Sequence, residues 1–140
     1  MDLLQMESIV TTQLKVRVPK TVVKTNPETT IHDLFPKLSF SNEVSDNVPD
    51  FPNIYIHELE PSEVANSLEN QEIHAIRDTI QVDVSTNTNR ADARIVANAC
   101  IKAMKQLRFS AVALSVYRKQ NNVHVFTTRF RRIVANGDTF

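Results

Sequence analysis

The apolar residues near the start of the chain recur every three or four positions, which is the spacing of one face of an α-helix. They are Leu3, Met6, Ile9 or Val10, and Leu14. This pattern predicts an amphipathic helix from about Asp2 to Arg17, and Pro19 limits its extension.

From residue 20 to 37 the pattern of apolar and polar residues predicts secondary structure less clearly. Thr30 is followed three positions later by Asp33, a capping-box spacing that predicts one short helix ending before Pro36.

Alternation of apolar and polar residues, typical of half-buried strands, begins with a short strand around Leu38 and Phe40. After a polar loop, the segment NIYIHEL predicts a strand because it is rich in β-branched and aromatic residues. Its two faces carry Ile54 and Ile56 on one side, and Tyr55 and His57 on the other. The acidic connection from Glu60 to Glu72 is expected to be an exposed loop.

The clearest strand runs from Ile73 to Ser85, where apolar and polar residues alternate over most of the segment. One face carries Ile76, Ile80, Val82 and Val84, and the other carries Arg77, Thr79, Gln81 and Asp83.

A second long helix is predicted from about Arg90 to Leu107, with Asn89 as its N-cap and Asp92 in its first turn. Its apolar stripe is Val96, Cys100, Ala103, Met104 and Leu107, flanked by Ile95 and Ala99. The segment AVALSVY then predicts a strand, the residues QNN a turn, and VHVFTTRFRRIV a second strand, so that the pair forms a hairpin.

These elements define an α+β fold in the order α-β-β-β-α-β-β. We expect an antiparallel or mixed sheet of about four to five strands, with two main helices packed on one face. The length of 140 residues is that of one domain, which we place over residues 1–140.

The amino-acid composition excludes several kinds of functional site. The chain has one Gly, where average usage gives about ten, so phosphate-binding loops rich in glycine are excluded. Its single cysteine, Cys100, excludes an intrachain disulfide and a zinc site built from cysteines. No stretch approaches 18 apolar residues, and the first residues lack the features of a signal peptide, so we expect a soluble, unexported chain.

Charge is balanced overall, with 16 basic and 16 acidic residues, but it is segregated along the chain. From Glu43 to Asp83 there are ten acidic residues and one arginine, a balance of minus nine. From Val84 to Arg132 there are ten basic residues and one aspartate, a balance of plus nine. Such segregation concerns association rather than fold.

No catalytic, cofactor or metal site can be assembled from these residues, and we expect no enzymatic activity. The four histidines, His32, His57, His74 and His124, lie on different elements without the spacing of a metal site. Cys100 lies in the apolar stripe of a helix, where a buried, inert thiol is the expected state.

The densest basic run is Arg129, Arg131 and Arg132. Strand alternation puts Arg129 and Arg131 on one face, and Arg132 on the other with Phe130. Phe126 and Phe130 next to these bases are compatible with a sheet that stacks RNA bases, and equally with the core face of the hairpin.

Three segments together resemble one family, the tail terminator (tail completion) proteins of long-tailed bacteriophages. They are FPNIYIHELE, IQVDVSTNTNRADARIVANACIKAMKQLRF and VHVFTTRFRRIVANGD, and the likeness extends over about Asp50 to Phe140. What is similar is their serial order: a strand led by Phe-Pro, a strand ending in Thr and Asn, a helix finishing in Met-x-x-Leu, and a strand with Arg-Phe-Arg-Arg. Two departures are Arg108, where many members have Gly, and residues 20–37, which are extra material.

The resemblance implies a virion protein without enzymatic activity that assembles in the host cytoplasm. It would form a homo-oligomeric ring, usually a hexamer, at the head-proximal end of the tail tube. There it would stop polymerisation of the tail tube protein and offer a joining surface to the head-completion or connector protein. Genome DNA would pass through the ring without sequence-specific binding, and no membrane would be involved.

A ring requires two unlike surfaces on each subunit, and the charge blocks supply candidates for them. The candidate interface residues are Glu58, Glu60, Glu63, Glu69, Glu72, Arg129, Arg131 and Arg132. The loop from Glu60 to Glu72 and the turn from Gln120 to Asn122 are candidate axial contacts. The alternative functions are a head-completion or adaptor protein of the phage neck, an RNA-binding module built on a sheet, and a small phage effector that acts on the host.

Overall fold

The structure is a computed structural model that describes residues 6–23, 26–42, 50–59, 62–66, 73–112 and 115–135. Its helices are α1 (Met6–Arg17), α2 (Ile31–Leu34) and α3 (Arg90–Gln106). Its strands are β1 (Val22–Val23), β2 (Asn26–Thr30), β3 (Ser39–Ser41), β4 (Asn53–Glu58), β5 (Ser62–Asn66), β6 (Ile73–Thr86), β7 (Ser110–Ala111), β8 (Val116–Gln120) and β9 (Val123–Ala135). The fold is α+β, as the sequence predicts.

The main sheet is built around the two longest strands, β6 and β9, which pair antiparallel along almost their whole length. One edge of β6 binds β4 and β5 in succession, and the far edge of β9 binds β8 and β7. The strand β3 extends the sheet beyond β4 and is parallel to it, which makes the sheet mixed. A separate small sheet pairs β1 with β2.

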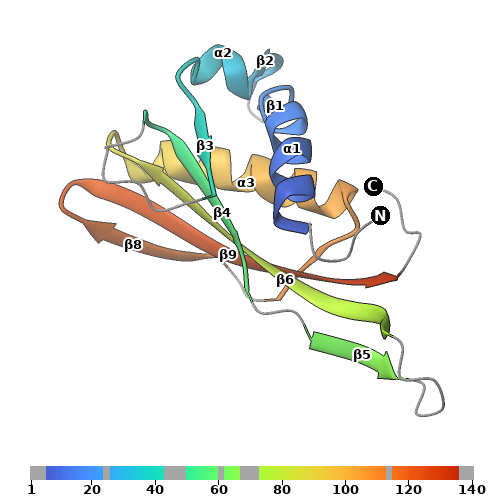
Figure 1. The fold of residues 1–140 in the computed structure, drawn as a ribbon. Coiled ribbons are helices and arrows are strands. Elements are labelled where there is room, and N and C mark those ends of the chain that lie inside the picture. Colours follow the sequence, from blue (N-terminus) through green and yellow to red (C-terminus); the bar gives the residue numbers. More distant parts are fainter. Residues whose placement is uncertain are drawn as a thin grey trace.

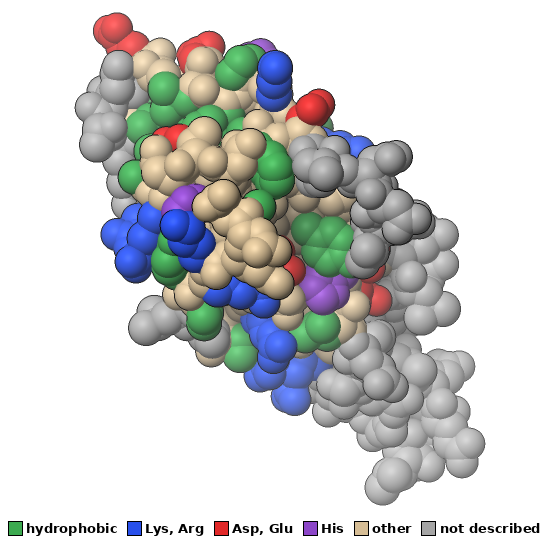
Figure 2. Space-filling view, turned by 90° about the vertical axis from the view of Figure 1, so that its left-hand side faces the viewer, with side chains coloured by type: hydrophobic (Ala, Val, Ile, Leu, Met, Phe, Trp, Pro, Cys, Tyr) green, Lys and Arg blue, Asp and Glu red, His purple; other side chains and the backbone are tan. Residues whose placement is uncertain are grey.

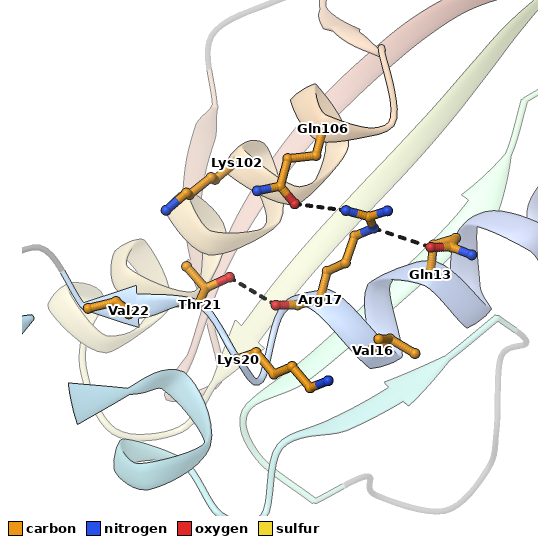
Figure 3. A pocket seen from close by; sticks show the side chains of 8 residues that line it. All are labelled: Gln13, Val16, Arg17, Lys20, Thr21, Val22, Lys102 and Gln106. Carbon is orange, nitrogen blue, oxygen red and sulfur yellow. Dashed lines mark hydrogen bonds between the residues drawn. The ribbon is translucent and has the colours of Figure 1, made fainter. Parts of the chain in front are cut away.

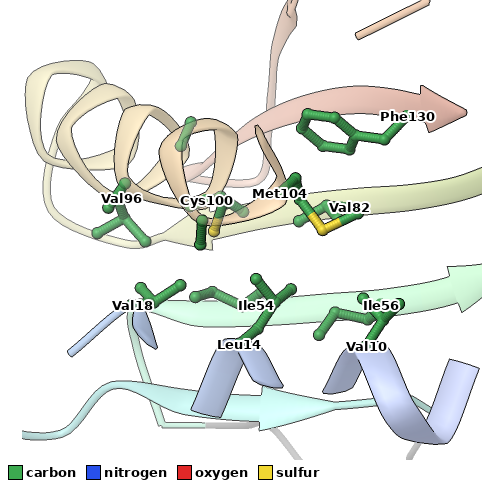
Figure 4. Close-up of a cluster of buried hydrophobic side chains, with 14 of the residues drawn as sticks. Val10, Leu14, Val18, Ile54, Ile56, Val82, Val96, Cys100, Met104 and Phe130 are labelled. Atoms are coloured by element: carbon green, nitrogen blue, oxygen red, sulfur yellow. The ribbon is translucent and has the colours of Figure 1, made fainter. Parts of the chain in front are cut away.

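The helices α1 and α3 pack on the same face of the main sheet and against each other (Figures 1 and 4). Helix α1 lies over β4, and α3 lies over β6 and β9. The core between these layers is apolar, and the side chains that fill it from the sheet are Ile54, Ile56, Ile80, Val82, Val84, Phe126 and Phe130. The helices add Met6, Val10 and Leu14 from α1, and Ala93, Val96, Cys100, Ala103 and Met104 from α3, followed by Leu107.

Helix α3 is capped at both ends by hydrogen bonds of its flanking residues. At the start, Asn89 Oδ1 accepts a hydrogen bond of 2.8 Å from the Asp92 amide. At the end, Arg108 takes a left-handed conformation, with φ of 69°. The amide of Arg108 then donates to the Lys105 carbonyl, and that of Phe109 to the Met104 carbonyl, which together form a Schellman motif. Arg108 thus takes the backbone conformation for which glycine is the usual residue.

The structure confirms most of the predicted elements, including the faces of β4 and β6 and the apolar stripe of α3. Thr30 and Asp33 form the predicted capping box at the start of α2. The predicted turn before β9 is present, with Asn121 and Asn122 at φ of 50° and 64°, values that asparagine tolerates well.

Two predictions about the strands were wrong. The connection from Glu60 to Glu72 is not wholly a loop, because it contains β5, whose backbone pairs with the first half of β6. The single strand predicted from AVALSVY is two short strands, β7 and β8, which pair with different parts of β9. In both places the long neighbouring strand supplies the backbone partners, which side-chain patterning does not reveal.

The core can be tested by placing a charge in the middle of β6. Val82 is 1% exposed and faces α3, so Val82→Asp buries a carboxylate without a partner and should lower the free energy of unfolding by about 3 kcal/mol or more. Urea unfolding followed by circular dichroism measures this.

Val116→Asp is the matched control, because Val116 is 62% exposed on β8 and the same substitution there should change stability by less than about 1 kcal/mol. Equal stability of the Val82→Asp variant and the wild type would mean that the faces of β6 are assigned the wrong way round.

Candidate functional site

The face of the main sheet opposite the helices is here called the open face, because no helix of the described residues covers it. Its side chains are those that alternate with the core positions: Tyr55 and His57 on β4; Arg77, Thr79, Gln81 and Asp83 on β6; Thr127, Arg129 and Arg131 on β9; and Val116 and Arg118 on β8. The alternation that buries one face therefore gathers polar and basic residues on the other.

The centre of the open face is a row of polar side chains held in register across the strands. Gln81 lies between His57 on β4 and Arg129 on β9. Arg129 Nε donates a 3.1 Å hydrogen bond to Gln81 Oε1, and Gln81 Nε2 donates to the Asp83 carboxylate at 3.4 Å. Thr127 Oγ1 donates to the same carboxylate at 2.6 Å. Asp83 is thus satisfied by neutral donors.

The open face is basic. Arg77, Arg118, Arg129 and Arg131 are all exposed, whereas Asp83 is half-buried. Among the described residues, no ion pair joins Arg129 or Arg131 to a carboxylate, and Arg129 is held by the neutral amide of Gln81 instead. Figure 2 shows Lys and Arg side chains gathered across the middle and lower part of the molecule on this side. These arginines keep their charge available for a partner.

The structure separates the three arginines of the candidate interface. Arg129 and Arg131 share the open face as predicted, opposite Gln81 and Thr79. Arg132 points into the protein, is 7% exposed, and donates through Nη1 to the Leu107 carbonyl at 3.0 Å. Its place as a surface contact is therefore corrected: it ties β9 to the end of α3.

The aromatic side chains of β9 do not lie on the open face. Phe126 and Phe130 are 5% and 0% exposed and belong to the core. Of the two interpretations that the sequence allows, the core face of the hairpin is correct. The aromatic residues on the open face are instead Tyr55 and His57, with ring centroids 5.0 Å apart.

Of the five acidic candidates, Glu58 and Glu63 lie on described strands. Glu58 ends β4 and is half-buried on the helix side of the sheet. Glu63 lies on β5, paired in register with Ile76. Glu60, Glu69 and Glu72 lie outside the described residues.

Neither the histidines nor the cysteine forms a reactive cluster in the part of the chain that is described. His32, His57 and His124 lie on α2, β4 and β9, and no group of three His, Cys, Asp or Glu side chains there is arranged to hold a metal ion. Cys100 is buried in the core, and burial raises the pKa of its thiol to about 12. At neutral pH this thiol is protonated and unreactive.

A group of carboxyls that sequence reasoning missed lies at one end of the core. Asp78 is 0% exposed on β6, and Glu58 on the neighbouring strand β4 has its Oε2 buried. Glu7 of α1 joins them and accepts a 3.0 Å hydrogen bond from the Glu58 amide. Opposite Asp78 in the strand register lies Arg132. Three elements therefore bring carboxyls together in a partly dry site.

We expect Glu58 and Asp78 to share a proton. If both were ionised, Glu58 Oε2 and both Asp78 oxygens would be buried without a hydrogen-bond donor. Burial raises the pKa of Glu58 to about 8, and hydrogen bonding to Asp78 and the negative charges of Asp78 and Glu7 act in the same direction. Burial also raises the pKa of Asp78, partly offset by the hydrogen bond that a protonated Glu58 donates to it. A proton on one carboxyl supplies the missing donor.

Asp78 was detectable in the sequence. It occupies a core position of β6, two residues from Ile76 and two from Ile80, so the apolar alternation is broken there by a carboxylate. Glu7 could not be found in this way, because only the packing of α1 on β4 brings it to Glu58.

Comparison of this chain with models of known protein families and with curated proteins finds no match. Among the described residues, none of the helices has the length and apolar character needed to span a bilayer.

The shared proton makes stability depend on pH. The ordinary pKa of Glu58 is 4.5 and its folded pKa is about 8, so the stabilisation is fully present below about pH 4.5 and is lost as pH rises through 8. Because Glu58 is half-buried and partly screened by solvent, we expect the free energy of unfolding to fall by about 1 to 2 kcal/mol between pH 5 and pH 9. Urea unfolding at several pH values measures the slope.

Glu58→Gln should flatten this dependence, because an amide donates a hydrogen bond to Asp78 at every pH. Asp50→Asn removes an exposed carboxylate and serves as the control, which should keep the wild-type slope. A Glu58→Gln variant with the full wild-type slope would place the titrating proton elsewhere.

Proposed function

We propose that this protein is a tail terminator of a long-tailed bacteriophage, a ring-forming virion protein that caps the head-proximal end of the tail tube. The observation that carries the proposal is the arrangement of the segments on which the resemblance rests. They correspond to β4, β6, α3 and β9, which together form the centre of the sheet and the helix that crosses it. The resemblance thus involves the structural centre of the protein.

The open face supports a subunit contact. A closed ring joins its subunits head to tail, so each needs two different and complementary surfaces. Arg129 and Arg131 are exposed there, and no ion pair links them to a carboxylate of the described residues. We assign the complementary surface to the acidic residues Glu60, Glu63, Glu69 and Glu72 of the neighbouring subunit.

Charge pairing within one sheet is the competing explanation for the two charge blocks. It would require Asp83 to bind Arg129 or Arg131, which lie on the neighbouring strand. Instead Asp83 accepts hydrogen bonds from Thr127 and Gln81, and Arg129 bonds to Gln81. These contacts favour the contact between subunits.

In this role the ring ends polymerisation of the tail tube protein and presents its other side to the head-completion or connector protein. Such work requires shaped surfaces and no catalysis. The genome passes through the lumen, and the protein makes no sequence-specific contact with it.

The subunit contact predicts a specific response to salt and to charge reversal. Exposed charges are screened beyond about 8 Å at physiological ionic strength, so the ring should assemble less completely as salt rises while the fold of the subunit persists. The variant with Arg129→Glu and Arg131→Glu should fail to form rings at low salt, as measured by native mass spectrometry.

Lys15→Glu with Lys105→Glu gives the same change of charge on exposed positions of α1 and α3, and should still form rings. If the arginine variant forms rings as readily as wild type, these two residues do not carry the subunit contact.

The function itself predicts a defect in particle assembly. When the gene is removed from the phage that encodes this protein, we expect tails of uncontrolled length and tails that do not join heads, seen by electron microscopy of lysates. Supplying the wild-type protein should restore joined particles. Tails of normal length beside leaking heads would assign the protein to head completion instead.

A further inference from the structure

A cavity of about 340 Å³ lies in the helical layer of the molecule, on the side away from the open face of the sheet (Figure 3). It opens between the C-terminal half of α1, the turn that follows α1, and the second half of α3. Its wall combines positive charge with apolar surface, and no carboxylate of the described residues lines it.

The positive charge comes from Arg17, Lys20 and Lys102, of which Arg17 is held in a fixed position. Arg17 Nε donates to Gln13 Oε1 at 3.2 Å, and Arg17 Nη1 donates to Gln106 Oε1 on α3 at 3.1 Å. Both acceptors are neutral amides. The guanidinium is therefore oriented without being neutralised, and its other N–H groups remain for a ligand.

The apolar part of the wall is formed by Val16 and Val22, which are 51% and 41% exposed. They are two of the six large hydrophobic side chains that are exposed in the described part of the chain, and both line this one cavity. A single exposed valine needs no explanation. Here two valines lie on the same wall as three cationic side chains, so the cavity offers both apolar and positively charged surface.

Helix stabilisation accounts for only part of this arrangement. A cation in the last turn of a helix interacts favourably with the helix dipole, which explains Arg17 in α1. It does not explain Lys102, since the last turn of α3 has its own cation in Lys105. It also gives no reason for the two exposed valines.

We propose that the α1–α3 cavity docks an acidic segment of a partner protein that presents carboxylates and apolar side chains on the same face. The carboxylates would bind Arg17, Lys20 and Lys102, and the apolar side chains would cover Val16 and Val22. Inorganic phosphate would leave the valines uncovered. A nucleic acid is disfavoured because, in the part of the chain that is described, no aromatic side chain lines the cavity to stack its bases.

The site is separate from the ring contact under Proposed function. Arg129 and Arg131 lie on the open face of the sheet, whereas α1 and α3 cover the opposite face. Loss of one site therefore leaves the other intact, and failure of either proposal can be recognised by itself.

The test uses the full chain and three synthetic peptides: acetyl-Leu-Leu-Glu-Glu-Leu-amide, the same peptide with Gly for Leu, and the same peptide with Lys for Glu. Binding is measured by chemical-shift changes in the ¹⁵N–¹H NMR spectrum. We expect the first peptide to bind saturably and to shift the amides of Val16 to Val22 and of Lys102 to Gln106. The other two should bind at least about tenfold more weakly, a difference of about 1.4 kcal/mol.

The variant Lys20→Glu with Lys102→Glu should weaken binding of the acidic peptide by at least about tenfold. The control Lys15→Glu with Lys105→Glu carries the same charge change on exposed residues that do not line the cavity, and should bind like wild type.

Equal loss in both double variants would show unspecific attraction and overturn the proposal. So would shifts confined to the open face, or equal binding of the glycine peptide, which would mean that the valines play no part. Absence of saturable binding would also overturn it.

Discussion

The antiparallel pairing of β6 with β9 is the centre on which the main sheet and its two long helices are built. Twelve residue pairs connect the two strands, from Ala75 with Ala135 to Thr86 with His124. Because side chains alternate along a strand, a slip of one residue would move Phe130 to the open face and Arg129 into the core. One register thus sets both the apolar core and the basic surface, and β4, β5, β7 and β8 bind to the outer edges of this pair.

The covered face and the open face of the main sheet contribute different properties to the protein. On the covered face, α1 and α3 bury a continuous apolar cluster, and the carboxyls of Glu58 and Asp78 lie at its end. On the open face, amide and hydroxyl groups hold the charged side chains in place, as Gln81 does for Arg129. The covered face of the sheet therefore supplies most of the buried apolar contacts, whereas the open face supplies exposed charge.

The sequence could predict elements whose own side chains carry the pattern. The alternation of β6 and the apolar stripe of α3 are visible without any partner, and so are the capping signals at Thr30 and Asn89. Strand β5 could not be predicted, since its place depends on the backbone of β6. The same holds for the division of one predicted strand into β7 and β8, which bind different stretches of β9.

The sequence could likewise predict only part of the candidate site. The alternation of side chains along a strand was enough to predict Arg129 and Arg131 on one face and Arg132 on the other. Only the structure shows how deeply Arg132 is buried. The contacts that orient these groups depend on register and packing. Gln81 meets Arg129 from 48 positions away, and Gln106 meets Arg17 from 89 positions away.

The distance along the chain between β6 and β9 also affects how the protein is made. During synthesis β6 appears first, followed by α3, β7 and β8, and the central pair of the sheet cannot form until β9 has left the ribosome. The β8–β9 hairpin closes locally through Asn121 and Asn122, whereas β6 with β9 must close a much longer loop, which is the slower event. Until then β6 has one edge without its partner. The middle of the sheet is thus completed by the last of the described strands to be synthesised, and this edge of β6 stays exposed in the nascent chain until that point.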